Sequence, residues 1–256
     1  MAFKSSTRDI VPLDHHPFIA RISRFMKLSE TDLNCLERII ESEREIKKRR
    51  DLVVDGYEYR SLCFVKEGYA MRYKLLRNGK RQILNVIVPG DLIGFPVSLF
   101  DRSTYSVIAL SDLKFNVCSI NSYVGLCFER PQFGLALTWL AVQEGAIYAE
   151  HIVNIGRRTP VERLGHFLLE IHSRLLAVGL AEKASFDLPF SQEVLADVLG
   201  LSVPHLNRVM QQLRTEKLIS SQGRVVELSD VTGLQTLAHY LPPILTPIPV
   251  PPKRTK

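Results

Sequence analysis

The spacing of apolar residues divides the chain into a helical start, a strand-rich middle and a helical end. Residues 18–42 have a helical pattern, and Ser29 is placed to cap the second part of that run. From about residue 46 to residue 120 the apolar runs become short, and glycine turns separate them. This pattern predicts a small β-roll or barrel. The pair Asn78-Gly79 between two of these runs predicts a hairpin with a type I′ turn.

A long helix is predicted from about Gln132 to Ile155, after a start signal at Glu129-Arg130-Pro131. Apolar residues cover most of its circumference, so the helix must be covered on more than one side. The β-roll can cover one side and a second copy of the chain the other, which predicts a homodimer. The segment 156–160 breaks the helix and predicts a domain boundary.

The stretch from Ser191 to Leu228 has the pattern of a winged helix-turn-helix. Ser191 and Ser202 each precede a run with helical periodicity, where a hydroxyl can cap backbone N–H groups, and Gly200 lies between the two runs. After the second run, residues 221–224 form a turn between two short apolar strands. These strands predict a two-stranded hairpin, the wing.

The second of these helices has two chemically different faces. Its apolar face contains Leu206, Val209, Met210 and Leu213. Its opposite face contains Pro204, Arg208, Gln211 and Thr215, flanked by Asn207 and Gln212. Arginine can pair with guanine, and glutamine or asparagine with adenine, in a major groove of DNA.

The overall charge adds little to this prediction. The chain has 256 residues and a formal net charge of +6, which permits a polyanionic partner. Acidic residues nevertheless slightly outnumber basic ones between residues 160 and 230. The DNA-binding prediction therefore depends on the residue pattern. The sequence has no apolar run of about 18 residues and no secretion signal, so we expect no membrane partner and a cytoplasmic location.

No pattern typical of catalysis or metal binding is found in the sequence. The four cysteines contain no CxxC pair, the seven histidines have no metal-ligand spacing, and buried reduced thiols are expected. There is no P-loop, nucleophile elbow, HExxH motif or GxGxxG motif. We therefore expect neither an enzyme nor a metal or cofactor.

Three segments resemble the Crp/Fnr family of bacterial transcription regulators: SQEVLADVLGLSVPHLNRVMQQLRTEKLI with the Gly-Arg turn that follows, ILNVIVPGDLIG, and ERLGHFLLEI. The resemblance implies an α+β fold, in which a cyclic-nucleotide-binding-like jelly roll is followed by a dimerisation helix and a winged helix-turn-helix. The corresponding domains would be residues 18–130, 131–156 and 157–234. A proline-rich tail at 242–256 is predicted to be extended or disordered.

The resemblance also implies a homodimer that places two recognition helices, residues 202–215, in successive major grooves of double-stranded DNA. Arg208 matches the base-reading arginine of the family, whereas Pro204 stands where many members have a base-contacting glutamate. Ser191, Gln192 and Ser202 suit phosphate contacts. The full candidate DNA-binding set is Ser191, Gln192, Ser202, Val203, Pro204, His205, Asn207, Arg208, Gln211 and Arg224.

The predicted effector site resembles the family less closely than the DNA-binding segment does. In family members that bind cyclic nucleotides, a glutamate contacts the ribose and an Arg-Ser or Arg-Thr pair contacts the phosphate. Here Phe95 replaces the glutamate, and Ser103-Thr104 falls in the register of the pair. The resemblance therefore argues against cyclic AMP and leaves a small-molecule effector open. Candidate effector-binding residues are Gly90, Asp91, Gly94, Ser103 and Thr104.

One alternative to the DNA-binding regulator remains. The roll could be a small-molecule-binding module, for a cyclic nucleotide among others, whose C-terminal helices mediate protein contacts. Sequence-specific, salt-dependent binding to duplex DNA would distinguish the regulator from this module.

Overall fold

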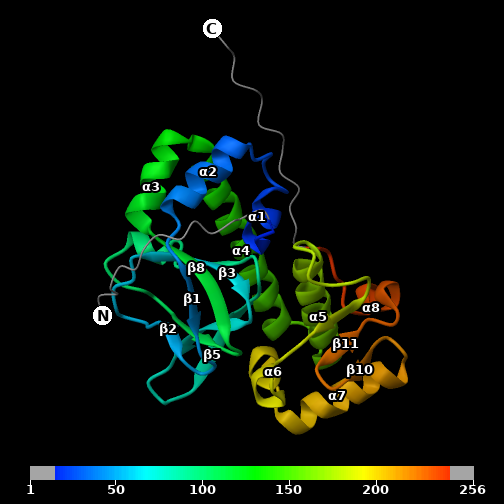
Figure 1. Ribbon diagram of the computed structural model, residues 1–256. Helices are drawn as coiled ribbons and strands as arrows, with labels where there is room; N and C mark the ends of the chain where they lie inside the picture. Colours follow the sequence, from blue (N-terminus) through cyan, green and yellow to red (C-terminus); the bar gives the residue numbers. More distant parts are fainter. Residues whose placement is uncertain (1–14, 243–256) are drawn as a thin grey trace.

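The computed structural model describes residues 15–242, so residues 243–256 of the predicted proline-rich tail lie outside the described part. It shows an N-terminal β-roll with helices at one end, a long central helix and a helical C-terminal unit that carries a small sheet (Figure 1). The predicted α+β class is confirmed.

The β-roll consists of two antiparallel four-stranded sheets, with the strand orders β1-β8-β3-β6 and β2-β7-β4-β5. Apolar side chains from both sheets, among them Val65, Ile87 and Val107, fill the space between them. The strands are β1 Glu43–Ile46, β2 Asp51–Val53, β3 Ser61–Glu67, β4 Ala70–Leu75, β5 Arg81–Ile87, β6 Leu92–Ile93, β7 Ser106–Ala109 and β8 Leu113–Ser119, with a 3₁₀ turn at Val97–Leu99.

The hairpin predicted at Asn78-Gly79 is present between β4 and β5, but its predicted turn type is wrong. Gly79 has a φ of +80°, whereas Asn78 is not among the residues with positive φ, as a type I′ turn would require. The Leu76 N–H donates to the Lys80 carbonyl at 2.7 Å, and the Gly79 N–H donates to the Leu76 carbonyl at 2.9 Å. These two bonds close a three-residue loop, in which only the glycine needs a left-handed conformation.

The helical start of the chain is two helices instead of one continuous run: α1 Pro17–Ile22 and α2 Glu30–Ile39. Ser29 caps α2 as predicted, since its Oγ accepts from the Asp32 N–H at 3.2 Å and Asp32 Oδ2 accepts from the Ser29 N–H at 3.0 Å. Together with α3 Ile120–Glu129, these helices pack against one end of the roll and the first turns of the long helix.

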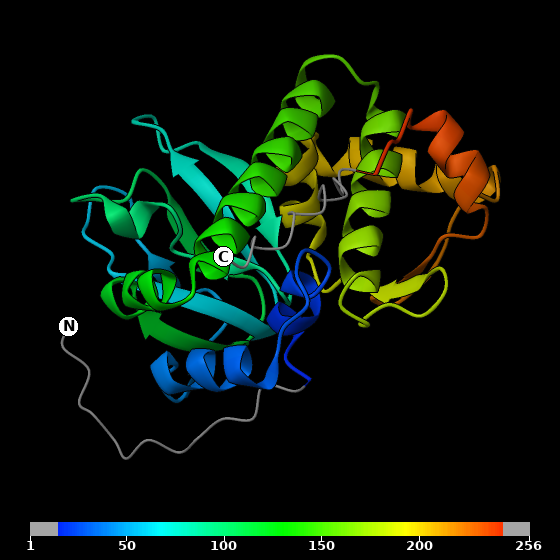
Figure 2. The ribbon, with the colours of Figure 1, turned by 90° about the horizontal axis from the view of Figure 1, so that it is seen from above.

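The predicted long helix is α4, Pro131–Gly156, which runs along the roll towards the C-terminal unit (Figure 2). The predicted break after it is confirmed, because α5 starts at Pro160 and extends to Leu176. Thr159 and Glu162 form a capping box at the start of α5 with bonds of 2.8 and 3.4 Å. Proline at the first helical position fits this start, since the missing N–H would be unpaired there in any case.

The C-terminal unit packs its helices around a core that includes Leu168, Leu195, Leu206 and Leu213. Its sheet has three strands in the order β10-β11-β9, so the predicted two-stranded wing gains an additional strand, β9, from residues that precede the helix-turn-helix. The elements are β9 Ser185–Asp187, α6 Gln192–Leu199, α7 Val203–Thr215, β10 Ser220–Gln222, β11 Val225–Glu227 and α8 Val231–Leu237.

Several contacts join the roll to the C-terminal unit. The Tyr69 hydroxyl on the roll donates to the Asp187 carbonyl at 3.0 Å. The Arg81 guanidinium on β5 contacts the Asp197 carboxylate on α6 at 2.5 Å. On the other side, Asp91 of the roll forms an ion pair with Arg174 of α5. Across residues 15–242, none of the helices has both the length and the apolar character that crossing a membrane requires.

Candidate nucleic-acid interface and effector region

The turn between α6 and α7 is built by Gly200. This residue has a φ of +63°, and the N–H of Leu201 then reaches the Ala196 carbonyl at 2.9 Å. Ser191 caps α6, because its Oγ accepts from the Val194 N–H at 3.3 Å. The turn therefore fixes the orientation of α7 relative to α6.

The predicted cap at the start of α7 is wrong in one respect. Ser202 occupies the N-cap position, but its side chain makes no capping hydrogen bond. A capping hydroxyl normally accepts from the second or third N–H of the helix, and Pro204 at the second position has none to give. The exposed Ser202 hydroxyl is thus left available for another acceptor or donor.

The two faces of α7 are as predicted. Leu206, Val209 and Leu213 are buried against α5 and α6. On the opposite side, four of the candidate residues are exposed: Pro204, Asn207, Arg208 and Gln211. Val203 and His205 lie at the edges of this face and are half-buried.

Few contacts hold the exposed side chains of α7. Asn207 Nδ2 donates to Gln192 Oε1 at 3.3 Å, which joins the outward faces of α6 and α7. Arg208 has no hydrogen bond or ion pair with any residue in the described part of the chain. An exposed guanidinium without an intramolecular partner is free to approach a base or a phosphate.

The wing residues are held by side chains that the sequence did not suggest. Arg224 contacts the Asp187 carboxylate on β9 at 2.6 Å, so part of its charge is balanced within the protein. Arg214 at the end of α7 donates to Ser221 Oγ at 2.6 and 3.2 Å, tying the recognition helix to the wing. Because β9 lies far from the wing in sequence, no local pattern could have indicated the first contact.

The structure brings most of the candidate DNA-binding residues to one exposed region, but two lie apart. Gln192, Ser202 and the exposed α7 residues are linked by the turn and by the contact between Asn207 and Gln192. Ser191 instead lines a cavity of about 430 Å³ between α6 and the roll. Arg224 lies on the wing between β10 and β11, where its carbonyl accepts from the Leu188 N–H at 2.8 Å.

The candidate effector-binding glycines lie on either side of β6, Gly90 in the turn between β5 and β6 and Gly94 directly after β6. Gly90 has a φ of +89°, and a Cβ there would lie 2.8 Å from Val178 Cγ1. Gly94 has a φ of +103°, and its Cβ would lie 2.1 Å from the Ser61 carbonyl oxygen. Both positions therefore require glycine for backbone reasons.

Asp91, the next effector candidate, is fully engaged within the protein. Its carboxylate forms ion pairs with Arg21 on α1 and Arg174 on α5, and it accepts from the Val88 N–H at 2.9 Å. Arg174 also contacts Glu170 at 2.9 Å. Asp91 thus links the roll to the C-terminal unit, and its oxygens are not free for a ligand.

Ser103 and Thr104 have different environments. Ser103 is buried and donates to the Tyr105 carbonyl at 2.7 Å. Thr104 is exposed, and its carbonyl accepts from Lys74 Nζ at 2.6 Å. The five effector candidates therefore do not converge on one binding surface.

A buried arginine that the sequence did not single out fills the side of the roll that faces α4. Arg72 on β4 is 1% exposed and forms an ion pair with Glu144 of α4. It also donates to the Leu92 carbonyl at 2.8 Å and to the Tyr148 hydroxyl at 3.2 Å. A buried guanidinium needs such partners, because desolvation would otherwise destabilise the fold.

Beside Arg72, a cavity of about 610 Å³ lies between the roll and α4. Its walls are largely apolar, with Val97, Phe100 and Ile155 among the lining residues, and Thr104 is the effector candidate that reaches it. His151 Nε2 lies 3.0 Å from the Ile83 carbonyl, and burial lowers the pKa of this histidine. The residues that line this cavity include no arginine or lysine.

The cysteines are free thiols. Cys63 and Cys118 are buried, and burial raises the pKa of Cys63 to about 12. Between residues 15 and 242, no three His, Cys, Asp or Glu side chains are grouped as metal ligands.

Two family models match the chain. Residues 43–122 match the cyclic nucleotide-binding domain, and residues 162–237 match the Crp-like helix-turn-helix domain. The first match covers the roll and the second covers α6, α7 and the wing.

Known proteins share this arrangement over most of their length. The chain is 32% identical to the nitrogen fixation regulation protein FixK of Bradyrhizobium diazoefficiens over 174 residues, which are 68% of this chain and 72% of that protein. It is 28% identical to the transcriptional activatory protein AadR of Rhodopseudomonas palustris, covering 93% of this chain and 98% of AadR. The solved structure of FixK2 from Bradyrhizobium japonicum aligns with a TM-score of 0.69 at 26% identity, over 77% of this chain and 96% of that one.

A nucleotide-binding-type roll joined by a long helix to a winged helix-turn-helix defines a two-domain transcriptional regulator. The chain belongs to the Crp/Fnr family, and its relatives are transcriptional regulators and not enzymes.

Proposed function

We propose that this regulator recognises DNA with the exposed face of α7, working as a homodimer that places one α7 in each of two successive major grooves. The observation that carries this proposal is the outward face of α7, where Arg208 is exposed and has no partner among residues 15–242. A guanidinium in that position can donate two hydrogen bonds to a guanine edge.

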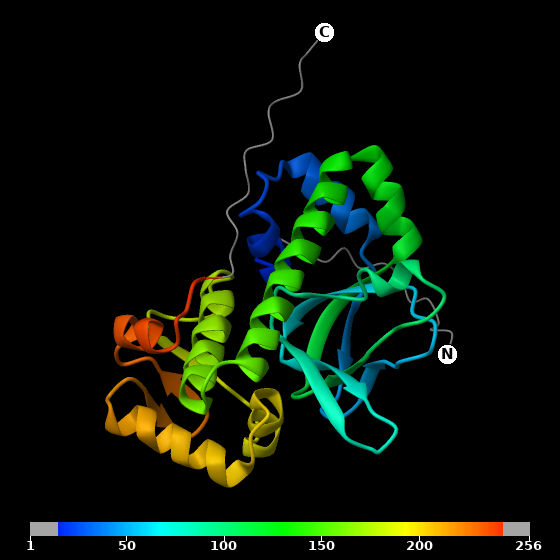
Figure 3. The same ribbon diagram turned by 180° about the vertical axis from the view of Figure 1, so that it is seen from behind.

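The dimer contact we propose is a stripe on α4. Seven exposed positions follow one another at alternating spacings of three and four residues: Leu135, Thr138, Val142, Gly145, Ala149, Ile152 and Gly156. This spacing is the seam of a two-stranded coiled coil. Figure 3 shows α4 with no described element in front of its middle turns, and Ile152 is 71% exposed. Small residues in the middle of the stripe would let two helices approach closely.

The other candidate residues have separate roles in this proposal. Asn207 and Gln211 are placed to contact bases beside Arg208, and Val203 and His205 border the same surface. Pro204 cannot accept a hydrogen bond through its side chain, so the base opposite it is selected by shape and apolar contact. Ser191, Gln192, Ser202 and Arg224 would contact phosphates, which fix the register of the helix on DNA.

The domain division that we propose follows the predicted ranges 18–130, 131–156 and 157–234. Because the DNA target lies where the chromosome is, we also propose a cytoplasmic protein. The sequence and its relatives support binding without catalysis, so we propose no enzymatic role.

The test is the effect of Arg208→Ala on binding to a site selected from random DNA by the purified protein. Loss of a bidentate contact should weaken binding to that site by about 1–3 kcal/mol per half-site and should relax the preference for one base pair. Binding to random duplex should fall much less. Arg77→Ala serves as the matched control, since Arg77 is an exposed arginine on the β4–β5 loop, away from α7.

Equal losses on selected and random DNA would assign Arg208 to phosphate contact alone. If no sequence is enriched and duplex binding does not depend on salt, the proposal is wrong and the C-terminal unit is a protein-contact module.

A further inference from the structure

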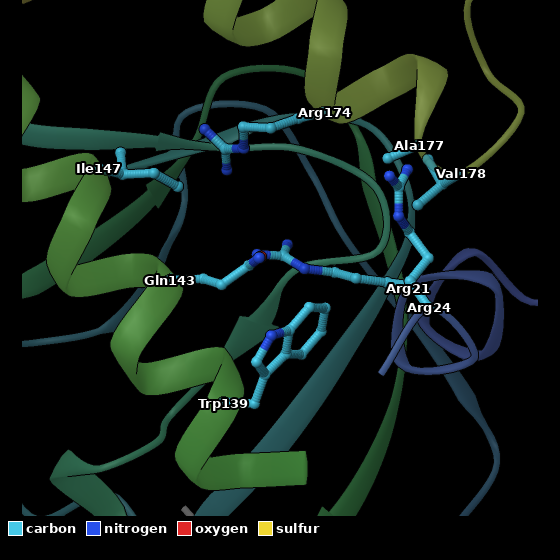
Figure 4. Close-up of a pocket in the computed structure, with 8 residues that line it drawn as sticks. All are labelled: Arg21, Arg24, Trp139, Gln143, Ile147, Arg174, Ala177 and Val178. Carbon is cyan, nitrogen blue, oxygen red and sulfur yellow. The ribbon is translucent and has the colours of Figure 1, made fainter. Parts of the chain in front are cut away.

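A pocket lies where α1, α4 and the end of α5 meet, on the opposite side of α4 from the proposed dimer stripe residue Ile152. Arg21 on α1 and Arg24 just after it, Trp139 and Gln143 on α4, and Arg174 on α5 line the pocket (Figure 4). Its volume is about 30 Å³. A buried water needs about 10–15 Å³ on this measure, so the pocket has room for a molecule of a few atoms.

The polar groups that line the pocket are almost all hydrogen-bond donors. Three of them are buried nitrogens that have no acceptor within the described chain: Trp139 Nε1, Gln143 Nε2 and Arg174 Nε. Trp139 and Gln143 are only 9% and 7% exposed, so bulk water does not readily replace the missing acceptors. Buried donors in folded proteins are normally paired, and unpaired ones indicate an absent partner.

The pocket also has a positive charge, which favours an anion as the unpaired donors do. Three guanidinium groups, those of Arg21, Arg24 and Arg174, line the pocket, and the first and third pair with two carboxylates, those of Asp91 and Glu170. Burial, and next the positive charges of Arg174 and Arg72, lower the pKa of Arg21 to about 9. Arg24 has no ion pair among the described residues and is exposed at the pocket entrance. Positive charge therefore remains after the internal ion pairs have formed.

We propose that this pocket binds a small oxyanion, of the kind represented by inorganic phosphate, nitrate or a short carboxylate. Its oxygens would accept from the Gln143 amide, the Trp139 indole N–H and the Arg174 Nε–H, while Arg21 and Arg24 would balance its charge. These donors come from the roll end, the long helix and the DNA-binding unit. A bound anion would therefore join the three parts of the molecule at one point.

The position of Trp139 gives a direct measurement, because it is the only tryptophan in the chain. The full-length protein would be titrated with sodium phosphate, nitrate or acetate while sodium chloride keeps the ionic strength constant, and tryptophan emission would be recorded. We expect a saturable change for at least one oxyanion. Comparison of the three probes then identifies the preferred geometry. A change that follows ionic strength alone, or no saturable change with any of the three, would overturn the proposal.

Two variants assign the response to the pocket. Arg24→Gln should raise the half-saturating anion concentration roughly tenfold, because the pocket loses a positive charge that balances the anion. Lys27→Gln removes the same charge from an exposed position three residues further along and should leave the titration unchanged. Equal effects of the two substitutions would show general charge attraction in place of a site.

Gln143→Glu gives an independent test in which the protein supplies the acceptor itself. The introduced carboxylate would occupy the place of the anion among the same donors, so we expect a higher melting temperature without anion and loss of the fluorescence response. A variant that still responds like the native protein would contradict the proposal. The titration is made without DNA, so its failure is distinct from a failure of the proposed DNA recognition. Once anion binding has been measured, a change of DNA affinity with anion concentration would show that the pocket and the DNA-binding face of α7 are coupled.

Discussion

Two arginines in this protein have opposite functions because their guanidinium groups lie in different surroundings. Arg208 is exposed and has no partner in the described chain, which leaves it available to DNA. Arg72 is enclosed between β4 and α4, where Glu144, Tyr148 and the Leu92 carbonyl contact its two terminal nitrogens. The second arrangement fixes the roll against the long helix.

Removal of the Arg72 charge should destabilise the folded protein. We expect Arg72→Met to lower the free energy of unfolding by about 3 kcal/mol, because Glu144 then keeps a poorly solvated charge. Urea denaturation followed by circular dichroism measures this loss. The double variant Arg72→Met with Glu144→Gln should recover part of it, since the unpaired carboxylate is gone. If the double variant is as unstable as the single one, packing and not charge explains the loss.

His16 makes the stability depend on pH. Its Nδ1 accepts from the Phe18 N–H at 3.1 Å at the start of α1, and burial lowers its pKa from 6.5 to about 4. The folded state therefore favours neutral His16, while the unfolded chain takes up a proton below pH 6.5. Stability from this group is complete above pH 6.5 and is lost as the pH falls towards 4.

When the pH is lowered from about 7.5 to about 5, protonation of His16 in the unfolded chain should lower the free energy of unfolding by about 2 kcal/mol. His16→Asn keeps an N-cap acceptor that does not titrate, so its unfolding free energy should fall less over the same range. The comparison with the native protein isolates His16 from His166, whose pKa burial also lowers to about 4. Parallel pH curves for the two proteins would show that His16 does not contribute.

The sequence predicted single residues well where their role depends on near neighbours. The two faces of α7 follow from helical spacing alone, and the structure has the same faces. The sequence could not predict the ion pairs of Arg72 and Asp91, because their partners lie on elements that are distant in the chain. Asp91 matched the family turn, yet the structure uses its carboxylate to join α1 and α5.

At the scale of elements, local signals placed most helix ends. Ser29 and Ser191 cap helices as predicted, and α5 starts at Pro160, the last residue of the predicted break. Elements that depend on distant pairing were missed. Strand β9 has three residues and is stabilised by pairing with β11, so its own sequence carries little signal.

The stripe on α4 gives a test of dimerisation. Gly145 lies in the middle of the stripe, and a Cβ added there meets no atom within 4 Å in the single chain. We expect Gly145→Glu to leave the monomer folded, because glycine is a poor helix former, and to shift the protein from dimer to monomer by placing charge in the seam.

Light scattering during size-exclusion chromatography measures the mass of each form. Gly125→Glu is the matched control, since Gly125 is also a helical, exposed glycine with open space around it, but lies on α3. A native protein that is already monomeric, or equal dissociation in both variants, would exclude the α4 stripe as the dimer contact.

At the scale of the whole molecule, the contacts between the roll and the C-terminal unit lie outside the large cavity. Arg81 and Asp197 join β5 to α6, and Asp91 and Arg174 join the turn after β5 to α5. The cavity beside α4 contributes to neither contact, and Glu144, which lines it, is held in an ion pair by Arg72. The two units are thus already connected without a molecule in the roll.

This arrangement predicts that cyclic AMP neither stabilises the protein nor changes its affinity for DNA. A cyclic phosphate would need a cation, and neither arginine nor lysine lines the cavity, while the charge of Arg72 is balanced by Glu144. A ligand present at about 100 times its Kd stabilises a folded protein by about 2.7 kcal/mol, which is visible as a higher Tm. Thermal unfolding and DNA titrations with and without cyclic AMP measure both quantities, and a saturable rise in Tm would show that the roll accommodates the nucleotide after displacement of Arg72.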